Sequence, residues 1–201
     1  MVNEMEERID LLGLKKALDF GYHEHSLWGN FKIIWTAFGI SLVWTMIATV
    51  ALGYLTALKP NEIQALIQAH LEIYNQLPAT ILASPKMMFF LACVLAPLWE
   101  EAAFRFSPLK LAKSWEFAST GEEYGSLLTS RCLWPMMLFT SIIFGLQHGG
   151  AINILFQGAG GILLAWVYVK SGYWASVTTH ALWNFMMMYG LPAVVGALAT
   201  P

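Results

Sequence analysis

Hydrophobic residues in this 201-residue chain form long runs that polar residues interrupt at a few points. The clearest run, Ile33 to Leu58, holds 26 residues without a formal charge, and about 20 apolar residues suffice for a helix to cross a bilayer. A second run covers Met87 to Phe106, and the run from Cys132 to Val169 is divided into two by Gly149-Gly150. A last run extends from Tyr173 to about Gly190. The pattern therefore predicts five membrane helices.

Two further stretches complete the predicted fold. Residues 61–77 place apolar side chains at helical spacing among Glu and Gln, with Asn61 as N-cap and Gln64 three positions later, which is typical of an amphipathic helix. We expect this helix to lie on the membrane surface or to cover neighbouring spans. Residues 191–201 are an extension of the last helix or a short sixth element. The predicted fold class is all-α: a polytopic membrane bundle of about five to six membrane helices plus one amphipathic interfacial helix.

Composition and charge support a membrane protein and exclude a nucleic-acid partner. The chain is 57% hydrophobic and only 12% charged, far from a typical soluble domain. Its net charge is −2, and it has no basic stripe that could follow a phosphate backbone. Residues 1–30 mix both charge signs, unlike a cleavable signal peptide, and are predicted to be an N-terminal cytoplasmic segment. Residues 31–201 are predicted to form a single transmembrane domain.

The distribution of basic residues predicts the orientation. With the N-terminus inside the cell, the inner connections hold nine Lys and Arg and the outer ones two, which fits the positive-inside rule for a multi-pass protein of the cell membrane. The charged connection 107–131 is then cytoplasmic. Glu100 and His180 fall about 10 Å inside the cytoplasmic face. His148, counted from Cys132, falls about 24 Å along its helix, so its depth disagrees with theirs.

Ionisable residues inside apolar runs are energetically costly and indicate a function. At the end of the second run, Glu101 and Arg105 lie four residues apart and can pair, whereas Glu100 points about 100° away. His148 ends the third run, and His180 lies within the last. Glu100 and the two imidazoles are therefore candidate site residues.

Three motifs in this order resemble those of a known family. Glu100-Glu101-x-x-x-Arg105, Phe144-x-x-x-His148 and His180-x-x-x-Asn184 are similar to the motifs of the CAAX prenyl endopeptidase and bacteriocin-processing (CPBP, or Abi) membrane proteases. The resemblance covers about residues 87–190, with Phe106 where many members have glycine. It implies an intramembrane endopeptidase that cleaves near the cytoplasmic face. Its substrate would be a peptide or protein, with membrane-anchored and prenylated chains as candidates.

The resemblance also implies roles for the motif residues. Glu100 and His148 would activate a water molecule, and His180 and Asn184 would form the oxyanion hole, while Glu101, Arg105 and Phe144 would support them. The chemistry is consistent with these roles. A carboxylate and an imidazole can share the proton of an attacking water, and two donors four apart on a helix can face one developing oxyanion.

Alternatives remain open for the metal and for the activity. Glu100, His148 and His180 could offer zinc one oxygen and two nitrogens. However, the chain has no His-Glu-x-x-His pair and no acidic residue after Glu123 that could orient either histidine. We therefore favour no cofactor, with zinc as the alternative. The alternative function is a non-proteolytic scaffold or immunity protein of the same family that binds another membrane protein, its polar residues only joining helices.

Overall fold

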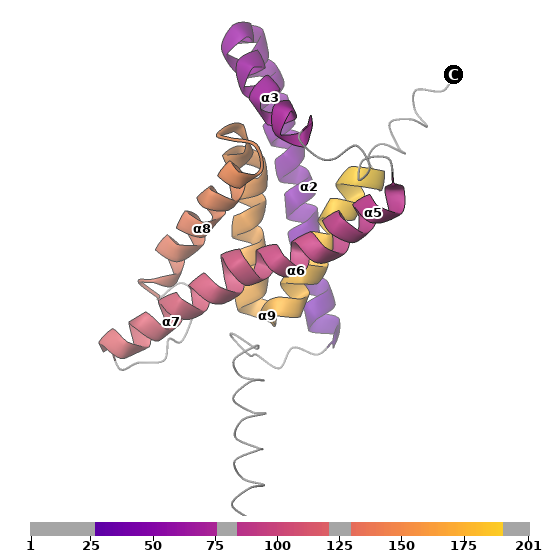
Figure 1. Cartoon of the computed structure of the whole chain (residues 1–201). Coiled ribbons are helices and arrows are strands. Elements are labelled where there is room, and N and C mark those ends of the chain that lie inside the picture. The colour runs from indigo at the N-terminus through magenta and orange to yellow at the C-terminus, as the bar shows by residue number, and fades with distance from the viewer. Residues whose placement is uncertain (1–26, 76–83, 121–129, 191–201) are drawn as a thin grey trace, which may run out of the picture.

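The computed structural model describes residues 27–75, 84–120 and 130–190, and every regular element within these ranges is helical. The elements, with π-helical turns labelled η, are α2 (Leu27–Leu58), α3 (Pro60–Asn75), α5 (Pro85–Phe90), η1 (Leu91–Leu95), α6 (Ala96–Glu101), η2 (Ala102–Phe106), α7 (Ser107–Thr120), α8 (Leu133–Gln147), η3 (Ile154–Gly158), α9 (Ala159–Phe185) and η4 (Met186–Gly190). The predicted all-α membrane bundle is confirmed (Figure 1). Most of the N-terminal segment 1–30 and the possible sixth element 191–201 lie outside the described residues.

Three helices are long and apolar enough to cross a membrane: Trp28–Leu58, Pro85–Thr120 and Ile154–Gly190. The third is not straight, because Gly172 has φ 83° and ψ −178°, a conformation that residues with a Cβ rarely adopt. Figure 1 shows the two arms of α9 meeting at this reversal. Gly149 and Gly150 also have positive φ, and they follow the C-terminal end of α8. Both breaks lie where the sequence predicts them.

The second membrane helix is longer than predicted. It does not end at Phe106 but continues as α7 to Thr120, so the expected connection 107–131 begins as helix. Leu109, Ala112 and Glu116 recur on one face of α7 and are buried. Hydropathy averaged over this stretch conceals that face, because lysines and other polar residues surround it. The predicted depth of Glu100 was counted from a helix end at Phe106, but the helix continues beyond that residue.

Two prolines shape the helix around Glu100. Each is preceded by a π-turn: the N–H of Ala96 bonds to the Leu91 carbonyl before Pro97, and Ser107 bonds to Ala102 before Pro108. The Ala92 carbonyl would accept from Ala96 in an α-helix or from residue 97 in a π-turn. Ala96 donates to Leu91 instead, and Pro97 has no N–H, so neither residue bonds to Ala92. A carbonyl group is thereby left available inside the bundle.

Helix α8 explains the depth of His148. Its 15 residues give a length of about 22 Å, shorter than the roughly 30 Å hydrocarbon core of a bilayer. Its N-terminal end is fixed by buried Glu116, whose carboxylate accepts hydrogen bonds from the Ser130 hydroxyl, from the Arg131 N–H at 2.9 Å and from the Cys132 N–H at 3.3 Å. His148 follows the other end of α8, and its Nε2 lies 3.7 Å from Glu100 Oε2, so the two side chains reach the same level of the bundle.

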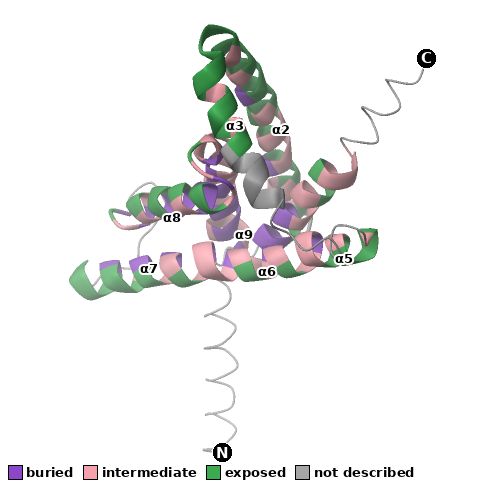
Figure 2. Ribbon diagram, turned by 45° about the horizontal axis from the view of Figure 1, so that its top comes forward, coloured by how far each residue is buried: buried purple, intermediate pink, exposed green. Residues whose placement is uncertain are grey.

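Helix α2 packs against α9, and α3 follows it as the predicted amphipathic helix. The small residues Ala37 and Ala48 on α2 are buried, whereas much of the rest of α2 is both apolar and exposed (Figure 2). The Trp44 indole donates a 2.7 Å hydrogen bond to the Leu155 carbonyl of η3. Apolar side chains turned outward over such a length are typical of a helix that faces lipid. This arrangement encloses a cavity between α2 and the motif-bearing helices.

Candidate active site

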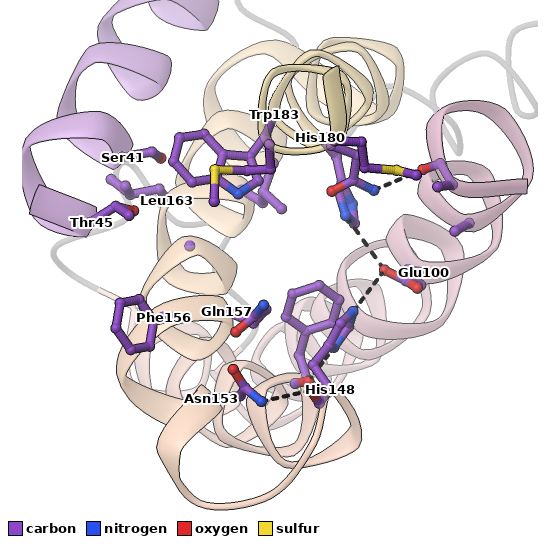
Figure 3. Close-up of a pocket in the computed structure, with 18 of the residues that line it drawn as sticks. Ser41, Thr45, Glu100, His148, Asn153, Phe156, Gln157, Leu163, His180 and Trp183 are labelled. Carbon is purple, nitrogen blue, oxygen red and sulfur yellow. Dashed lines mark hydrogen bonds and ion pairs between the residues drawn. The ribbon is translucent and has the colours of Figure 1, made fainter. Parts of the chain in front are cut away.

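A cavity of about 810 Å³ lies within the bundle, lined by residues of α2, α3, α5, η1, α6, α8, η3, α9 and η4. Most of its wall is apolar, including Phe38, Leu91 and Met187. Figure 3 shows polar groups at two places: Glu100 and the two histidines on one side, and Ser41 and Thr45 of α2 on the other. A mainly apolar cavity with a few convergent polar groups is typical of a binding or active site.

The structure brings together the three predicted groups Glu100, His148 and His180. One carboxylate oxygen of Glu100, Oε2, lies 3.7 Å from His148 Nε2 and 3.5 Å from His180 Nε2, and Figure 3 shows it between the two rings. These distances exceed those of good hydrogen bonds, and this enclosed oxygen has no hydrogen-bond partner among the described residues. A third atom, such as the oxygen of a water molecule, could bond to all three.

His148 is held by its own helix and by η3. Its Nδ1 lies 2.7 Å from the Phe144 carbonyl, which can only accept, so Nδ1 carries the proton and Nε2 faces Glu100. The Asn153 amide donates a 2.6 Å bond to the His148 carbonyl. The Phe144 ring lies 4.4 Å from the imidazole, centroid to centroid. The ring orientation of His148 is therefore set from three directions.

Glu101 does more than pair with Arg105. Its carboxylate is fully buried: Oε1 lies 2.9 Å from His180 Nδ1 and 3.4 Å from Arg105 Nη1, and Oε2 accepts a 2.5 Å bond from Ser176. A carboxylate on Nδ1 fixes the orientation of an imidazole and directs its Nε2 outward. The sequence has no acidic residue after Glu123 to orient either histidine, but Glu101, 79 residues before His180, takes this position.

Phe144 links the charged pair to the histidines. The Arg105 guanidinium carbon lies 4.1 Å from the centre of the Phe144 ring, a cation–π contact, and the His180 ring lies 5.7 Å from it. Gly161 makes room for the guanidinium, since a Cβ there would lie 2.9 Å from Arg105 Nη2. An aromatic ring at position 144 thus contacts both histidines and the buried arginine.

Asn184 lines the cavity but is already engaged. Its amide nitrogen donates a 2.8 Å bond to the Ala92 carbonyl, the group left without a helical donor by Pro97. A primary amide has two N–H groups. The second N–H can serve a bound molecule, while the first holds η1 against α9.

Comparison of the sequence with known protein families finds a match that contains the site. A family model described as type II CAAX prenyl endopeptidase Rce1-like matches residues 82–186, just over half of the chain, and this range contains all three motifs. The chain belongs to the Rce1-like family. No curated protein and no solved structure matches it at a significant level. Membership in this family of CAAX-type membrane proteases confirms the resemblance to CPBP proteins and implies a peptide or protein substrate.

Several polar residues of this Rce1-like chain contact the site or line its cavity without having been predicted, among them Asn153, Gln157 and Ser176. A usable signal was present, because uncharged polar side chains within apolar runs are also unusual in membranes. Asn153 and Gln157 even lie four residues apart. Neither side chain is ionisable, so the charge pattern alone does not indicate them.

Zinc is the metal ion that the atom types of the three site residues would suit. Glu100, His148 and His180 carry the right atom types. Within residues 27–75, 84–120 and 130–190, however, no group of three or more His, Cys, Asp or Glu has an arrangement that could hold a metal ion. The chemistry proposed below therefore uses only the residues of the chain itself.

Proposed function

We propose that this Rce1-like chain is an intramembrane endopeptidase in which Glu100 and His148 activate a water molecule against a peptide carbonyl. The observation that carries this proposal is Glu100 Oε2, which has no hydrogen-bond partner among the described residues and faces the Nε2 atoms of two separately oriented histidines inside the cavity. Burying such an oxygen without a hydrogen bond is unfavourable unless a bound molecule completes the set.

In the proposed reaction, the water oxygen bonds to the carbonyl carbon while its proton passes to Glu100 or His148. The tetrahedral intermediate then collapses, the carbon–nitrogen bond breaks, and the same proton goes to the leaving amine. His148 suits this task because Phe144 holds its Nδ1 proton, leaving Nε2 as the basic atom. No other group needs to change its covalent bonding.

His180 and Asn184 are proposed to stabilise the oxyanion. A neutral His180 with its proton on Nδ1 cannot donate from Nε2, so this role requires the imidazolium form. In that form its two ring N–H groups would face carboxylates, with Glu101 at 2.9 Å from Nδ1 and Glu100 at 3.5 Å from Nε2. Asn184 would contribute its second N–H.

We further propose a cytoplasmic N-terminus, with cleavage near the cytoplasmic face. The start of α2, the kink of α9 and α7 lie toward one side of the bundle, and the α2–α3 junction and α5 toward the other (Figure 1). This division matches the excess of basic residues predicted for the inner side. In a cysteine-free background, an outside-only thiol reagent should label Gln64→Cys and spare Ser119→Cys, and the reverse labelling would contradict this orientation.

The activity is tested with purified protein in lipid vesicles and a farnesylated peptide with a CAAX-type end, a probe chosen from the family name. The wild type should cleave the peptide, and Glu100→Gln and His148→Ala should each lower kcat by roughly 10²–10⁴-fold. Undiminished cleavage by either variant would refute the assigned roles. Binding of the peptide without cleavage by the wild type would favour the scaffold function instead.

A further inference from the structure

We infer that Gln157 is a substrate-binding residue whose side-chain amide holds the peptide backbone beside the scissile bond. The inference rests on the proposed peptidase function and extends it to a residue outside the three motifs. Gln157 lies on η3 and lines the same cavity as Glu100 and the two histidines. Figure 3 shows its amide inside the cavity, between Phe156 and His148.

The first observation is an unused hydrogen-bond acceptor. The amide oxygen of Gln157 is enclosed, yet it has no hydrogen-bond partner among the described residues. Enclosed amide groups in native proteins are nearly always bonded, so an exception calls for a missing partner. Glu100 Oε2 is in the same condition in the same cavity. Two unsatisfied acceptors that line one space indicate a polar molecule bound between them.

The second observation is that η3 is held rigidly. The Trp44 indole bonds to the Leu155 carbonyl at 2.7 Å, and Asn153 bonds to His148 at 2.6 Å. Buried Gly158 lies so close to α8 that a Cβ there would be 3.1 Å from the Ser141 carbonyl. A side chain on such a fixed element keeps its direction, which is what a binding residue requires. π-Helical turns are also frequent at functional sites.

The third observation concerns charge. Among the described residues that line the cavity there is no Lys or Arg, so no permanently charged cation lies there to neutralise a substrate carboxylate. Apart from Glu100 and the two histidines, the polar side chains labelled in Figure 3 are neutral: Gln157 and Asn153 near His148, and Ser41 and Thr45 on α2. A primary amide provides one acceptor and two donors, the complement of a peptide group. The cavity thus suits the uncharged backbone of an internal peptide bond better than a free C-terminal carboxylate.

The test uses Gln157→Leu, which keeps an apolar stem of similar size and removes both donor and acceptor. The matched control is Gln64→Leu, the same change at an exposed position of α3. The substrate is the farnesylated peptide, together with two analogues in which the amide on either side of the scissile bond is an ester. We expect Gln157→Leu to lower kcat/KM by about 3–10-fold, mainly through KM, and Gln64→Leu to leave it unchanged.

A double-mutant cycle then assigns the contact. With one of the two ester analogues, kcat/KM of the wild type should fall several-fold. The same ester should not lower kcat/KM of Gln157→Leu further, because this variant already lacks the hydrogen bond that the ester removes. Fully additive losses, or an unchanged kcat/KM in Gln157→Leu, would overturn the inference. A lower unfolding midpoint with unchanged KM would mean that Gln157 only supports packing, which also overturns it.

Failure of the peptidase proposal gives a different result. If the wild type does not cleave, or Glu100→Gln still does, the proposed function fails. In that case, the farnesylated peptide is labelled with a fluorophore, and its binding to the wild type and to Gln157→Leu is measured by fluorescence anisotropy. This measurement tests Gln157 alone. Binding that is several-fold weaker in the variant would support the inference, while equal binding or none to either protein would refute it.

Discussion

Glu100 and Glu101 are neighbours on α6, yet they lie in opposite environments. Glu101 faces the interior of the bundle, is fully buried, and is bonded to Ser176 and His180 with Arg105 beside it. Glu100 faces the cavity, where its Oε2 has no hydrogen bond to any of the described residues. A carboxylate whose oxygens are bonded by the protein is suited to support, whereas one with an unused oxygen is suited to bind and react. One step along a helix, about 100°, separates the two roles.

The largest expected effect on stability follows from Glu101→Gln. This change keeps the shape but leaves Arg105 as a buried charge without its partner, which costs about 3–5 kcal/mol in free energy of unfolding. Denaturant titration in detergent micelles measures the loss. The control is Glu62→Gln. The Glu62 side chain is 68% accessible and pairs with Lys59, so its loss should lower the free energy of unfolding by about 1 kcal/mol or less. Equal losses in the two variants would refute the supporting role of Glu101.

Asn184→Ala tests the proposed oxyanion hole, since Asn184 lines the same cavity as Glu100. Loss of one oxyanion donor should lower kcat by about 10²–10³-fold, leaving measurable cleavage. The variant also loses the Ala92 contact, so its unfolding is followed in parallel. If the variant is less stable but its kcat stays within tenfold of the wild type, Asn184 has only the structural role of holding η1 against α9.

Gly145→Ala acts on the position of His148. An added Cβ would lie 2.7 Å from the Asn153 carbonyl oxygen and from the Ile154 Cα, so α8 and η3 must separate. We expect a loss of about 1–3 kcal/mol in unfolding free energy and slower cleavage. Gly39→Ala is the matched control, since nothing lies within 4 Å of its added Cβ. Similar behaviour of the two variants would show that this close approach is unimportant.

Removal of metal should have the smallest effect. Cleavage by the purified wild type should be unchanged after exhaustive chelation, because a water activated by Glu100 and His148 needs no metal. Elemental analysis of the same sample provides the control. Loss of cleavage that zinc restores, with about one zinc per chain, would show that Glu100, His148 and His180 are metal ligands.

Much of the fold was predictable because it depends on local sequence. Uncharged runs gave the apolar helices, and glycines marked the reversals at Gly149-Gly150 and at Gly172. The continuation of the second helix through α7 was missed, because its buried face of Leu109, Ala112 and Glu116 is interrupted by polar residues. The π-turns before Pro97 and Pro108 depend on how a helix accommodates a missing N–H, which a count of apolar residues does not reveal.

The candidate site was predictable in its residues but not in its connections. Spacing alone indicated the Glu101–Arg105 pair, since both lie on one helix. The contact of Glu101 with His180 joins segments 79 residues apart, and local periodicity carries no information about it. The same is true of Asn184 and Ala92, whose bond depends on the carbonyl that Pro97 leaves without a donor.

The most direct test of the contrast between the two carboxylates is to measure cleavage and unfolding on the same preparation of Glu100→Gln. We expect cleavage of the farnesylated peptide to fall by roughly 10²–10⁴-fold. We also expect the loss in unfolding free energy to be much smaller than that of Glu101→Gln, because Glu100 Oε2 has no hydrogen bond to the described residues to lose. Retained cleavage, or a loss of stability as large as that of Glu101→Gln, would contradict the account.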